Sequence, residues 1–482
     1  MKIFLHNTLG RRLQEFQPLE PGHVGMYCCG PTVYHYAHIG NLRTYVNEDF
    51  LRRVLEYAGY EVNHVVNITD VGHLTSDADE GDDKMEKGAA REGRSVWEIA
   101  EHYTQAFFQD WTRLNLLQPT HWPRATDYIP QQIELVRDLE ERGFTYRTQD
   151  GVYFDTEKFP HYGDFAGLRL DKLMAGVRVD LGDKKNPTDF ALWKFSPTDK
   201  QRAMEWESPW GKGFPGWHVE CSAMGTSLIG RTLDIHCGGT DHIRVHHTNE
   251  IAQSECAHDG QIFARYWIHN EFLKTESDDK MSKSSGEFLT LQVLVDRGFH
   301  PLDYRYLCAT AHYRKFLTFS WPNMEAARDA HRGFRRRVAP LLAAWSASRA
   351  GDLDAPHADS EAERAWRDRF EEALGQDLNI PKALGVAQTL ARDGALTESA
   401  RGRILSDWDR VLGLELSVDL PDPPAPGADP ELSAWVEGKL SERLAARAAK
   451  DWAASDRIRD ELAARKVVVK DTAQGAVWSV AE

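Results

Sequence analysis

The stretch from Met26 to Asn41, MYCCGPTVYHYAHIGN, constrains the fold more than any other part of the chain. It overlaps an apolar run, Val24 to Cys29, that is typical of a buried strand, and it turns at Gly30-Pro31 into a segment with apolar residues at helical spacing. A helix that starts at a strand end directs free backbone N–H groups and a positive dipole end to one point, which suits a phosphate. An ordinary strand–turn–helix unit with exposed histidines fits the same pattern.

Size and composition indicate a protein of several domains. The chain has 482 residues and a net charge of −16, and the acidic balance argues against a nucleic-acid partner without excluding one. We expect no signal peptide, because MKIFLHNTLGRRL lacks an extended apolar region, and no apolar run approaches the length of a membrane span. In such a chain, which we expect to be cytoplasmic, the six cysteines favour metal binding or burial over disulfides.

Alternating strand and helix patterns predict a doubly wound parallel sheet. Strands are expected at Val24–Cys29, Glu61–Ile68 and Leu233–His236, and the run Trp217–Cys221 also has strand character. The long helical pattern after Asn41 joins the first two strands into a βαβ unit. Residues 155–215 are rich in Gly, Pro, Lys and Trp and are expected to be irregular, as part of an insertion that spans about 94–215.

Changes in composition along the chain predict its domain boundaries. The sheet domain is expected to cover 1–288, and a nearly continuous helical pattern predicts a bundle over 289–416. Five prolines lie between Ser417 and Pro430, so 417–430 is expected to be a linker. Residues 431–482 then predict a small module with a charged helical hairpin and two short strands.

A second motif lies far downstream, where Lys280 and Lys283 flank hydroxyl groups in the polar loop FLKTESDDKMSKSS. Lysines on a flexible loop can close over a polyphosphate and neutralise charge that develops at phosphorus. Most Lys- and Ser-rich segments are simply solvated loops, and that reading fits this segment on its own.

A third pattern suggests metal ligands. His246 and Glu250 are four residues apart, so a helix places both on one face, and Cys29 ends the first strand. With Cys221 they would form a mixed sulfur, nitrogen and oxygen set suited to zinc. Surface His/Glu pairs and buried thiols are the alternatives, and spacing alone does not show that the four converge.

The motifs together resemble a known family. HIGN and KMSKS are similar to the HIGH and KMSKS signatures of class I aminoacyl-tRNA synthetases, and MYCCGPTVYHYAHIGN is similar to the corresponding block of bacterial cysteinyl-tRNA synthetases. Further resemblances to that family extend nearly end to end: PGWHVECSAM, DIHCGGTDHIRVHHTNEIAQSE, KMSKSSG, AHYR, DLNIPKAL and the tail ARAAKDWAASDRIRDELAARKVVVKDTAQGAVW.

This resemblance implies a fold and an activity. The fold would be α/β, with a Rossmann-type doubly wound catalytic domain, a helical bundle that binds the tRNA stem and a C-terminal anticodon module. The activity would be cysteine–tRNA ligation: ATP activates L-cysteine to cysteinyl-adenylate, and cysteine then passes to the terminal ribose of tRNA(Cys). The implied cofactors are one Zn²⁺ and the Mg²⁺ that accompanies ATP, and we expect a monomer.

The resemblance also implies site residues by position. The zinc ligands would be Cys29, Cys221, His246 and Glu250, to which the substrate thiolate would add the last ligand. Substrate cysteine would lie against Gly30, Thr69, Trp217, His218 and His236. ATP would contact His35, His38, Gly40, Asn41, Gly238, Gly239, Asp241, Lys280 and Lys283, and the catalytic residues among these would be His38, Asn41, Lys280 and Lys283.

The sequence departs from the family pattern at a few positions. Asn41 replaces the last histidine of HIGH, so this position cannot carry a proton charge. Cys28 stands where the family usually has an apolar residue. Two rival functions share most motifs: a ligase that joins cysteine to an amino sugar, and a catalytically silent paralogue that binds tRNA or zinc. The tail beyond Pro430 argues against the first, and the intact KMSKS segment argues against the second.

Overall fold

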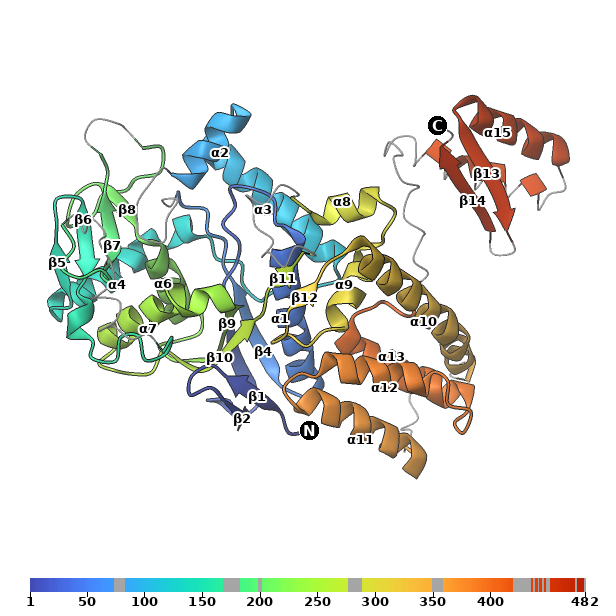
Figure 1. The fold of residues 1–482 in the computed structure, drawn as a ribbon, viewed down its shortest axis with the longest axis horizontal. Helices are drawn as coiled ribbons and strands as arrows, with labels where there is room; N and C mark the ends of the chain where they lie inside the picture. Colours follow the sequence, from blue (N-terminus) through green and yellow to red (C-terminus); the bar gives the residue numbers. More distant parts are fainter. Residues whose placement is uncertain are drawn as a thin grey trace.

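The computed structural model describes residues 1–72, 83–167, 183–197, 202–275, 288–348 and 359–418, and residues 435–480 apart from 437, 441, 444, 445, 448–450, 473 and 474. Figure 1 shows a central sheet between a smaller inserted sheet and a group of helices. None of the helices in these described ranges is both long and apolar enough to cross a lipid bilayer.

The central sheet has four parallel strands: β3 (His23–Cys28), β4 (Glu61–Val66), β9 (Leu233–Gly239) and β10 (Ala264–Asn270). Their order is β10-β9-β3-β4, with Cys28 beside Cys237 and Met26 beside Ile235 in the β3–β9 register. The chain therefore winds outward in two directions from the β3–β9 pair, and a doubly wound sheet binds ligands at such a reversal of strand order. The predicted fold class is confirmed.

Helices cover both faces of this sheet (Figure 1). Helix α1 (Ile39–Tyr57) connects β3 to β4, and its apolar residues share a core with Met26, Cys28 and Ile235. Helices α6 (Trp217–Leu228) and α7 (His246–Ala257) pack on the other face, where Tyr27 and Cys29 belong to a second core. Consecutive residues of β3 thus face opposite cores, as strand geometry requires.

The prediction of a strand at Trp217–Cys221 was wrong, because these residues form the first turns of α6. The segment is buried from His218 to Gly225, so its apolar residues show no helical periodicity. A short apolar run of this kind does not distinguish a strand from a buried helix. Gly216, whose backbone is extended, begins the helix.

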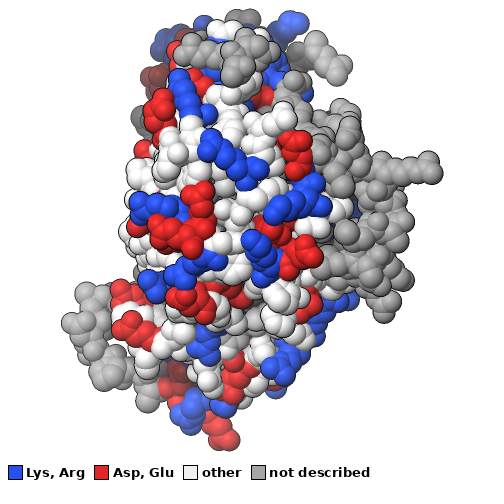
Figure 2. Space-filling model, turned by 90° about the vertical axis from the view of Figure 1, so that its left-hand side faces the viewer, with Lys and Arg blue, Asp and Glu red and all other residues white. Residues whose placement is uncertain are grey.

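The prediction that 155–215 is irregular was also wrong in part. Strands β7 (Phe190–Phe195) and β8 (Gly213–Pro215) extend β5 (Thr145–Arg147) and β6 (Gly151–Phe154) into an antiparallel sheet of order β5-β6-β7-β8. The aromatic run FALWKF carried a strand signal that the surrounding Gly and Pro residues obscured. Figure 2 shows the side on which this sheet lies, where basic and acidic residues are interspersed rather than gathered by sign.

Other elements complete the chain. The acidic run DADEGDD, Asp77–Asp83, has the composition of a solvated loop, but Asp83 is buried, caps α2 and pairs with Arg202; residues 77–82 lie outside the described ranges. The remaining α-helices and strands are β1 (Phe4–Asn7), β2 (Arg12–Glu15), α2 (Lys84–Glu92), α3 (Val96–Arg113), α4 (Ile129–Glu141), β11 (Leu273–Lys274), α8 (Leu291–Asp296), α9 (Pro301–Ala309), β12 (Leu317–Thr318), α10 (Trp321–Ser348), α11 (Glu361–Gly375), α12 (Ile380–Leu390), α13 (Glu398–Leu412), α15 (Trp452–Ala464), β13 (Val467–Thr472) and β14 (Gly475–Val480).

Candidate active site

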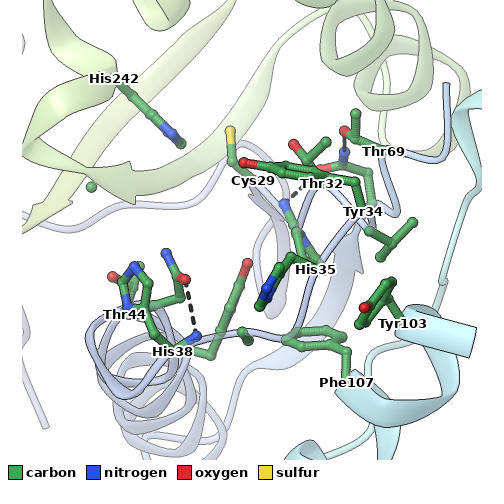
Figure 3. A pocket seen from close by; sticks show the side chains of 18 of the residues that line it. Cys29, Thr32, Tyr34, His35, His38, Thr44, Thr69, Tyr103, Phe107 and His242 are labelled. Atoms are coloured by element: carbon green, nitrogen blue, oxygen red, sulfur yellow. Dashed lines mark hydrogen bonds between the residues drawn. The ribbon is translucent and has the colours of Figure 1, made fainter. Parts of the chain in front are cut away.

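A cavity of about 230 Å³ opens at the carboxyl ends of β3, β4 and β9. Figure 3 shows Cys29 and Thr69 on one side of it and His35 and His38 on the other. The cavity therefore joins the predicted metal ligands to the predicted phosphate site. Its lining comprises Cys29, Gly30, Pro31, Thr32, Val33, Tyr34, His35, Tyr36, Ala37, His38, Asn41, Thr44, Tyr45, Asn67, Thr69, Tyr103, Phe107, Trp217, Cys221, Gly239, Asp241, His242 and His246.

The four predicted metal ligands converge at one end of this cavity. One donor atom from each of Cys29, Cys221, His246 and Glu250 lies within 4.8 Å of the others, and all four residues are buried. Cys29 directly follows β3, α6 supplies Cys221, and one face of α7 supplies His246 and Glu250, whose Nε2 and Oε1 atoms are 2.6 Å apart. Two sulfurs, an imidazole and a carboxylate are a donor set that suits a tetrahedral Zn²⁺.

Interactions within this cluster shift the pKa values of its members. Burial opposes a charge on His246, but the Glu250 carboxylate and the Cys221 sulfur outweigh it and raise the pKa of His246 to about 10. A hydrogen bond from the Cys29 thiol lowers the pKa of Cys221 to about 7, while burial raises the pKa of Cys29. The cluster thus holds protons close to anionic groups, and a bound metal cation would take the place of those protons.

Histidines outside the predicted ligand set surround the cluster. His236 Nε2 lies 2.5 Å from Glu250 Oε2, and His218 Nδ1 lies 3.0 Å from His246 Nδ1. Neither residue lines this cavity, and each lies against one of the predicted metal ligands. Sequence reasoning missed His247, whose Nε2 lies 3.4 Å from Cys29 Sγ. His247 follows His246 directly, so helical spacing favoured only the first of the pair.

A chain of hydrogen bonds fixes the floor of the cavity. Gly30 N donates to Asn67 Oδ1 at 2.7 Å, Asn67 Nδ2 donates to Thr69 Oγ1, and Thr69 Oγ1 donates to Glu220 Oε2, both at 3.0 Å. A Cβ atom on Gly30 would lie 1.5 Å from the Asn67 carbonyl oxygen, so only glycine fits. Asn67 and Glu220 were not predicted, although each stands within two residues of a predicted position, Thr69 and Cys221.

The first turn of α1 forms the opposite wall. His38 is its N-cap: His38 Nδ1 accepts from Asn41 N at 3.1 Å, and His38 N donates to Asn41 Oδ1 at 3.3 Å. This reciprocal capping occupies one side-chain atom of each residue and leaves Asn41 exposed at the cavity. Gly40 packs closely on the His38 ring and does not itself line the cavity.

The other predicted ATP residues are only partly assembled by the described chain. His35, Gly239 and Asp241 line the cavity, whereas Gly238 packs beneath it against the rings of His242 and His247. The predicted cysteine-site residue Trp217 also lines the cavity, and its ring stacks on His246 with centroids 4.4 Å apart. Lys280 and Lys283 lie outside the described residues.

The strand that leads toward Lys280 is nevertheless tied to α1. Arg43 is buried, and its guanidinium donates to the carbonyls of Glu271 at 2.5 Å, Phe272 at 2.7 Å and Lys315 at 2.6 Å. Glu271 and Phe272 directly precede β11 (Leu273–Lys274). One side chain of α1 therefore holds the base of the segment that carries both predicted phosphate-binding lysines.

Comparison with known proteins gives a consistent result. Residues 15–329 match the family model "tRNA synthetases class I (C) catalytic domain", and residues 429–478 match "Cysteinyl-tRNA ligase anticodon binding domain". Cysteine–tRNA ligase 1 of Burkholderia lata is 52% identical, and the match covers 98% of this chain and 96% of the relative. Cysteine–tRNA ligase of Treponema denticola is 44% identical, with 99% of each chain covered.

A comparison of structures supports the fold. Methionyl-tRNA synthetase of Mycobacterium tuberculosis bound by methionyl-adenylate superposes with a TM-score of 0.54 over 89% of this chain and 94% of that chain. Its sequence identity is 15%, so the likeness bears on the fold alone.

Proposed function

The chain belongs to the cysteinyl-tRNA synthetases of class I, and from this premise we propose how its site selects and activates cysteine. Cys29, Cys221, His246 and Glu250 would hold one Zn²⁺. Gly30, Thr69 and Trp217 would contact the amino acid, and the first turn of α1 would face the phosphates of ATP. Convergence of the four donor atoms beside a cavity that His38 and Asn41 also line carries this proposal.

The donor set fits zinc on chemical grounds. Two thiolates are soft ligands, and the four donors all lie within 4.8 Å of one another, near enough to share one ion. Since the four protein donors already complete a tetrahedral set, the substrate would be accepted as a fifth ligand when zinc is bound, and the thiolate of cysteine fills that position far better than the hydroxyl of serine. Such a difference gives a discrimination that pocket shape alone does not reach.

The residues of this chain would position the activation step. The cysteine carboxylate attacks the α-phosphorus of ATP, a bond to the α-phosphorus forms, and the bond to pyrophosphate breaks. The N–H groups and dipole of α1 favour negative charge at its start, with Mg²⁺ accompanying the triphosphate. Lys280 and Lys283 would neutralise the leaving pyrophosphate. A hydroxyl of the terminal tRNA ribose then attacks the cysteinyl carbonyl, and AMP leaves.

The remaining parts of the chain would recognise tRNA. We propose that 289–416 contacts the tRNA stem, that 417–430 is a linker, and that 431–482 reads the anticodon, in line with the match of 429–478 to an anticodon-binding domain. Helix α10 carries a basic run, HRGFRRR (His331–Arg337), and part of it packs inside the protein: His331 is buried against Asp303, and Arg335 donates to the Leu414 carbonyl. We further propose that the enzyme acts as a cytoplasmic monomer.

Cysteine-dependent exchange between ATP and pyrophosphate tests the activation step. We expect exchange with cysteine and none with serine. Removal of zinc or the change Cys221→Ala should abolish it, and zinc should restore the metal-free wild-type enzyme but not the variant. The change Cys256→Ser, at a buried cysteine of α7 outside the cluster, is the matched control and should retain exchange. Exchange that persists without metal would refute the proposed zinc role.

Charging of tRNA(Cys) tests the acceptor. An amino-sugar ligase would pass the exchange test equally, but it would transfer cysteine to an amino sugar and not to tRNA. A silent paralogue would fail both assays. The anticodon-domain match favours tRNA, since a small acceptor has no anticodon to read.

A further inference from the structure

A second buried cluster of metal-ligating groups lies outside the proposed active site. One donor atom from each of Cys28, Glu48 and Cys237 lies within 4.8 Å of the others. Cys28 and Cys237 are 0% exposed and Glu48 is 2% exposed. None of the three lines the cavity described above, and none has a role in the proposed reaction.

This cluster occupies the opposite face of the central sheet. Cys28 and Cys237 are direct neighbours in the parallel register of β3 and β9, so their side chains point to the same face. That face is covered by α1, which supplies Glu48, and Cys28 shares its core with α1 residues. Cys29, next in sequence to Cys28, points to the other face and belongs to the other core. The two clusters are therefore separated by the sheet itself.

Glu48 is the unusual member. Both of its carboxylate oxygens are buried, and among the described residues no arginine, lysine or backbone N–H donates to them; only the Cys28 thiol of the same cluster interacts with this carboxyl group. The neighbouring buried ionic groups of α1 have clear polar partners: Asp49 pairs with Arg53 at 2.7 Å and with Arg305 at 2.6 Å, and the terminal nitrogens of Arg43 donate to backbone carbonyls. A buried carboxyl group that lacks such partners is costly and calls for an explanation.

We propose that Cys28, Glu48 and Cys237 bind a second zinc ion, between α1 and strands β3 and β9. Two thiolates and a bidentate carboxylate provide four donor atoms, which is the coordination number of a structural zinc site. Thiolate ligands disfavour Mg²⁺ and Ca²⁺, which prefer oxygen. The ion would give both oxygens of Glu48 a partner in one step.

The position of the ion assigns it a structural role. It would tie α1 to the two central strands about three turns after the His38 cap, and so hold the first turn of α1 against the cavity. It touches neither cysteine nor ATP. Its loss should therefore lower thermal stability and leave the choice of cysteine over serine unchanged.

Metal content of the full-length enzyme tests this directly. Protein saturated with zinc and freed of excess metal by gel filtration should hold two zinc ions per chain. The conservative change Glu48→Gln should reduce this to one, as should Cys221→Ala at the other cluster, and the double variant should hold none. Cys308→Ala removes a buried cysteine that belongs to neither cluster and should retain two. Circular dichroism of each variant checks that it is folded.

Cobalt gives a second readout that does not depend on activity. In the Cys221→Ala background, added Co²⁺ should produce a sulfur-to-cobalt charge-transfer band, and Cys28→Ala or Cys237→Ala should remove it. One zinc per chain in the wild type, with no change in Glu48→Gln, would overturn the second site and leave the proposed catalytic zinc intact. Loss of all zinc on Cys221→Ala alone would also overturn it.

Discussion

Asn41 both completes the capping box of α1 with His38 and faces the cavity, and two substitutions separate these roles. Asn41→Asp retains an oxygen that can accept from His38 N, so thermal stability should be unchanged, but it places a negative charge where we expect the triphosphate. Its KM for ATP should rise at least about tenfold, which corresponds to about 1.4 kcal/mol. Asn41→Ala loses the hydrogen bond from His38 N to Oδ1, at a cost of about 1 kcal/mol, and should raise this KM less.

Pyrophosphate-exchange kinetics at varied ATP and thermal unfolding of both variants measure the two effects. Equal KM values for ATP in the Asp and Ala variants would show that position 41 does not face the phosphates. The KM for cysteine is the internal control and should remain unchanged in both, because the proposed zinc cluster lies at the other end of the cavity.

His64 should make folding sensitive to mild acid. It is buried on β4, and burial together with the nearby Arg52 lowers its pKa to about 3, so the folded state holds it neutral. The unfolded chain binds this proton below about pH 6.5, so the stabilising contribution is present above that pH and is lost as pH falls. By pH 5.5 the loss is about 1.4 kcal/mol.

His64→Phe should reduce the fall in melting temperature between about pH 7.5 and pH 5.5 relative to the wild type. The exposed His23 of β3 provides the matched control, and His23→Gln should keep the wild-type pH dependence. If the melting temperature falls by the same amount on acidification in His64→Phe and in the wild type, the neutral buried state of His64 is refuted.

At the scale of residues, sequence spacing predicted which side chains lie together where the residue types suit a metal and the spacing matches a helix or a strand end. His246 and Glu250 could be placed together because they lie four apart on one helix, and Cys29 because it ends a strand. His247 could not, since its contact with Cys29 depends on how α7 packs against β3. Glu48 was missed for a related reason: nothing in the sequence distinguishes a buried glutamate from the solvated glutamates of other helices.

Helix α1 links the two parts of the predicted ATP site. It begins at the His38 cap and, one turn later, Arg43 holds the carbonyls of Glu271 and Phe272. Arg43→Lys cannot make the same fork of hydrogen bonds, and Arg43→Met makes none, which leaves buried carbonyls unpaired at a cost of about 3 kcal/mol or more. We expect kcat for exchange and thermal stability to fall in the order wild type, Lys, Met, with the KM for cysteine unchanged.

Exchange kinetics and thermal unfolding test this order. Arg52, on the same helix, donates to Glu56 and to the Gln118 carbonyl rather than to the segment before β11, so Arg52→Lys is the matched control and should keep kcat. A loss of stability in Arg43→Lys without a loss of kcat would show that the residue is structural only and does not position the segment that carries Lys280 and Lys283.

At the scale of elements, long periodic segments were predictable and short apolar ones were not. Helices α1, α10 and α13 follow clear amphipathic patterns, and β3 and β4 follow from their turn signals. Helix α6 was mistaken for a strand because it is buried on nearly all sides. Strand β7 was missed because it is a short segment among Gly and Pro residues. Its strand structure depends on pairing with β6 and β8, which the local sequence does not show.

The whole molecule contains separate hydrophobic cores. The largest core extends from the sheet face under α1 into helices α9 to α13, and the buried Arg305 reinforces it by joining Asp49 of α1 to the Leu412 carbonyl of α13. The C-terminal module has its own small core of Val436, Ile458, Leu462 and Val467. Removal of the module should therefore leave the folding of the catalytic part intact.

A chain ending at residue 416 should consequently keep cysteine-dependent exchange at the wild-type rate and charge tRNA much less efficiently. We expect kcat/KM for tRNA(Cys) to fall roughly 100-fold, about 2.7 kcal/mol, because contacts remote from the reacting atoms would be lost while those atoms remain in place. Exchange and thermal unfolding of the shortened chain are the controls for folding. Unaltered charging would refute anticodon reading by 431–482, whereas intact transfer to an amino sugar would show that the acceptor was never tRNA.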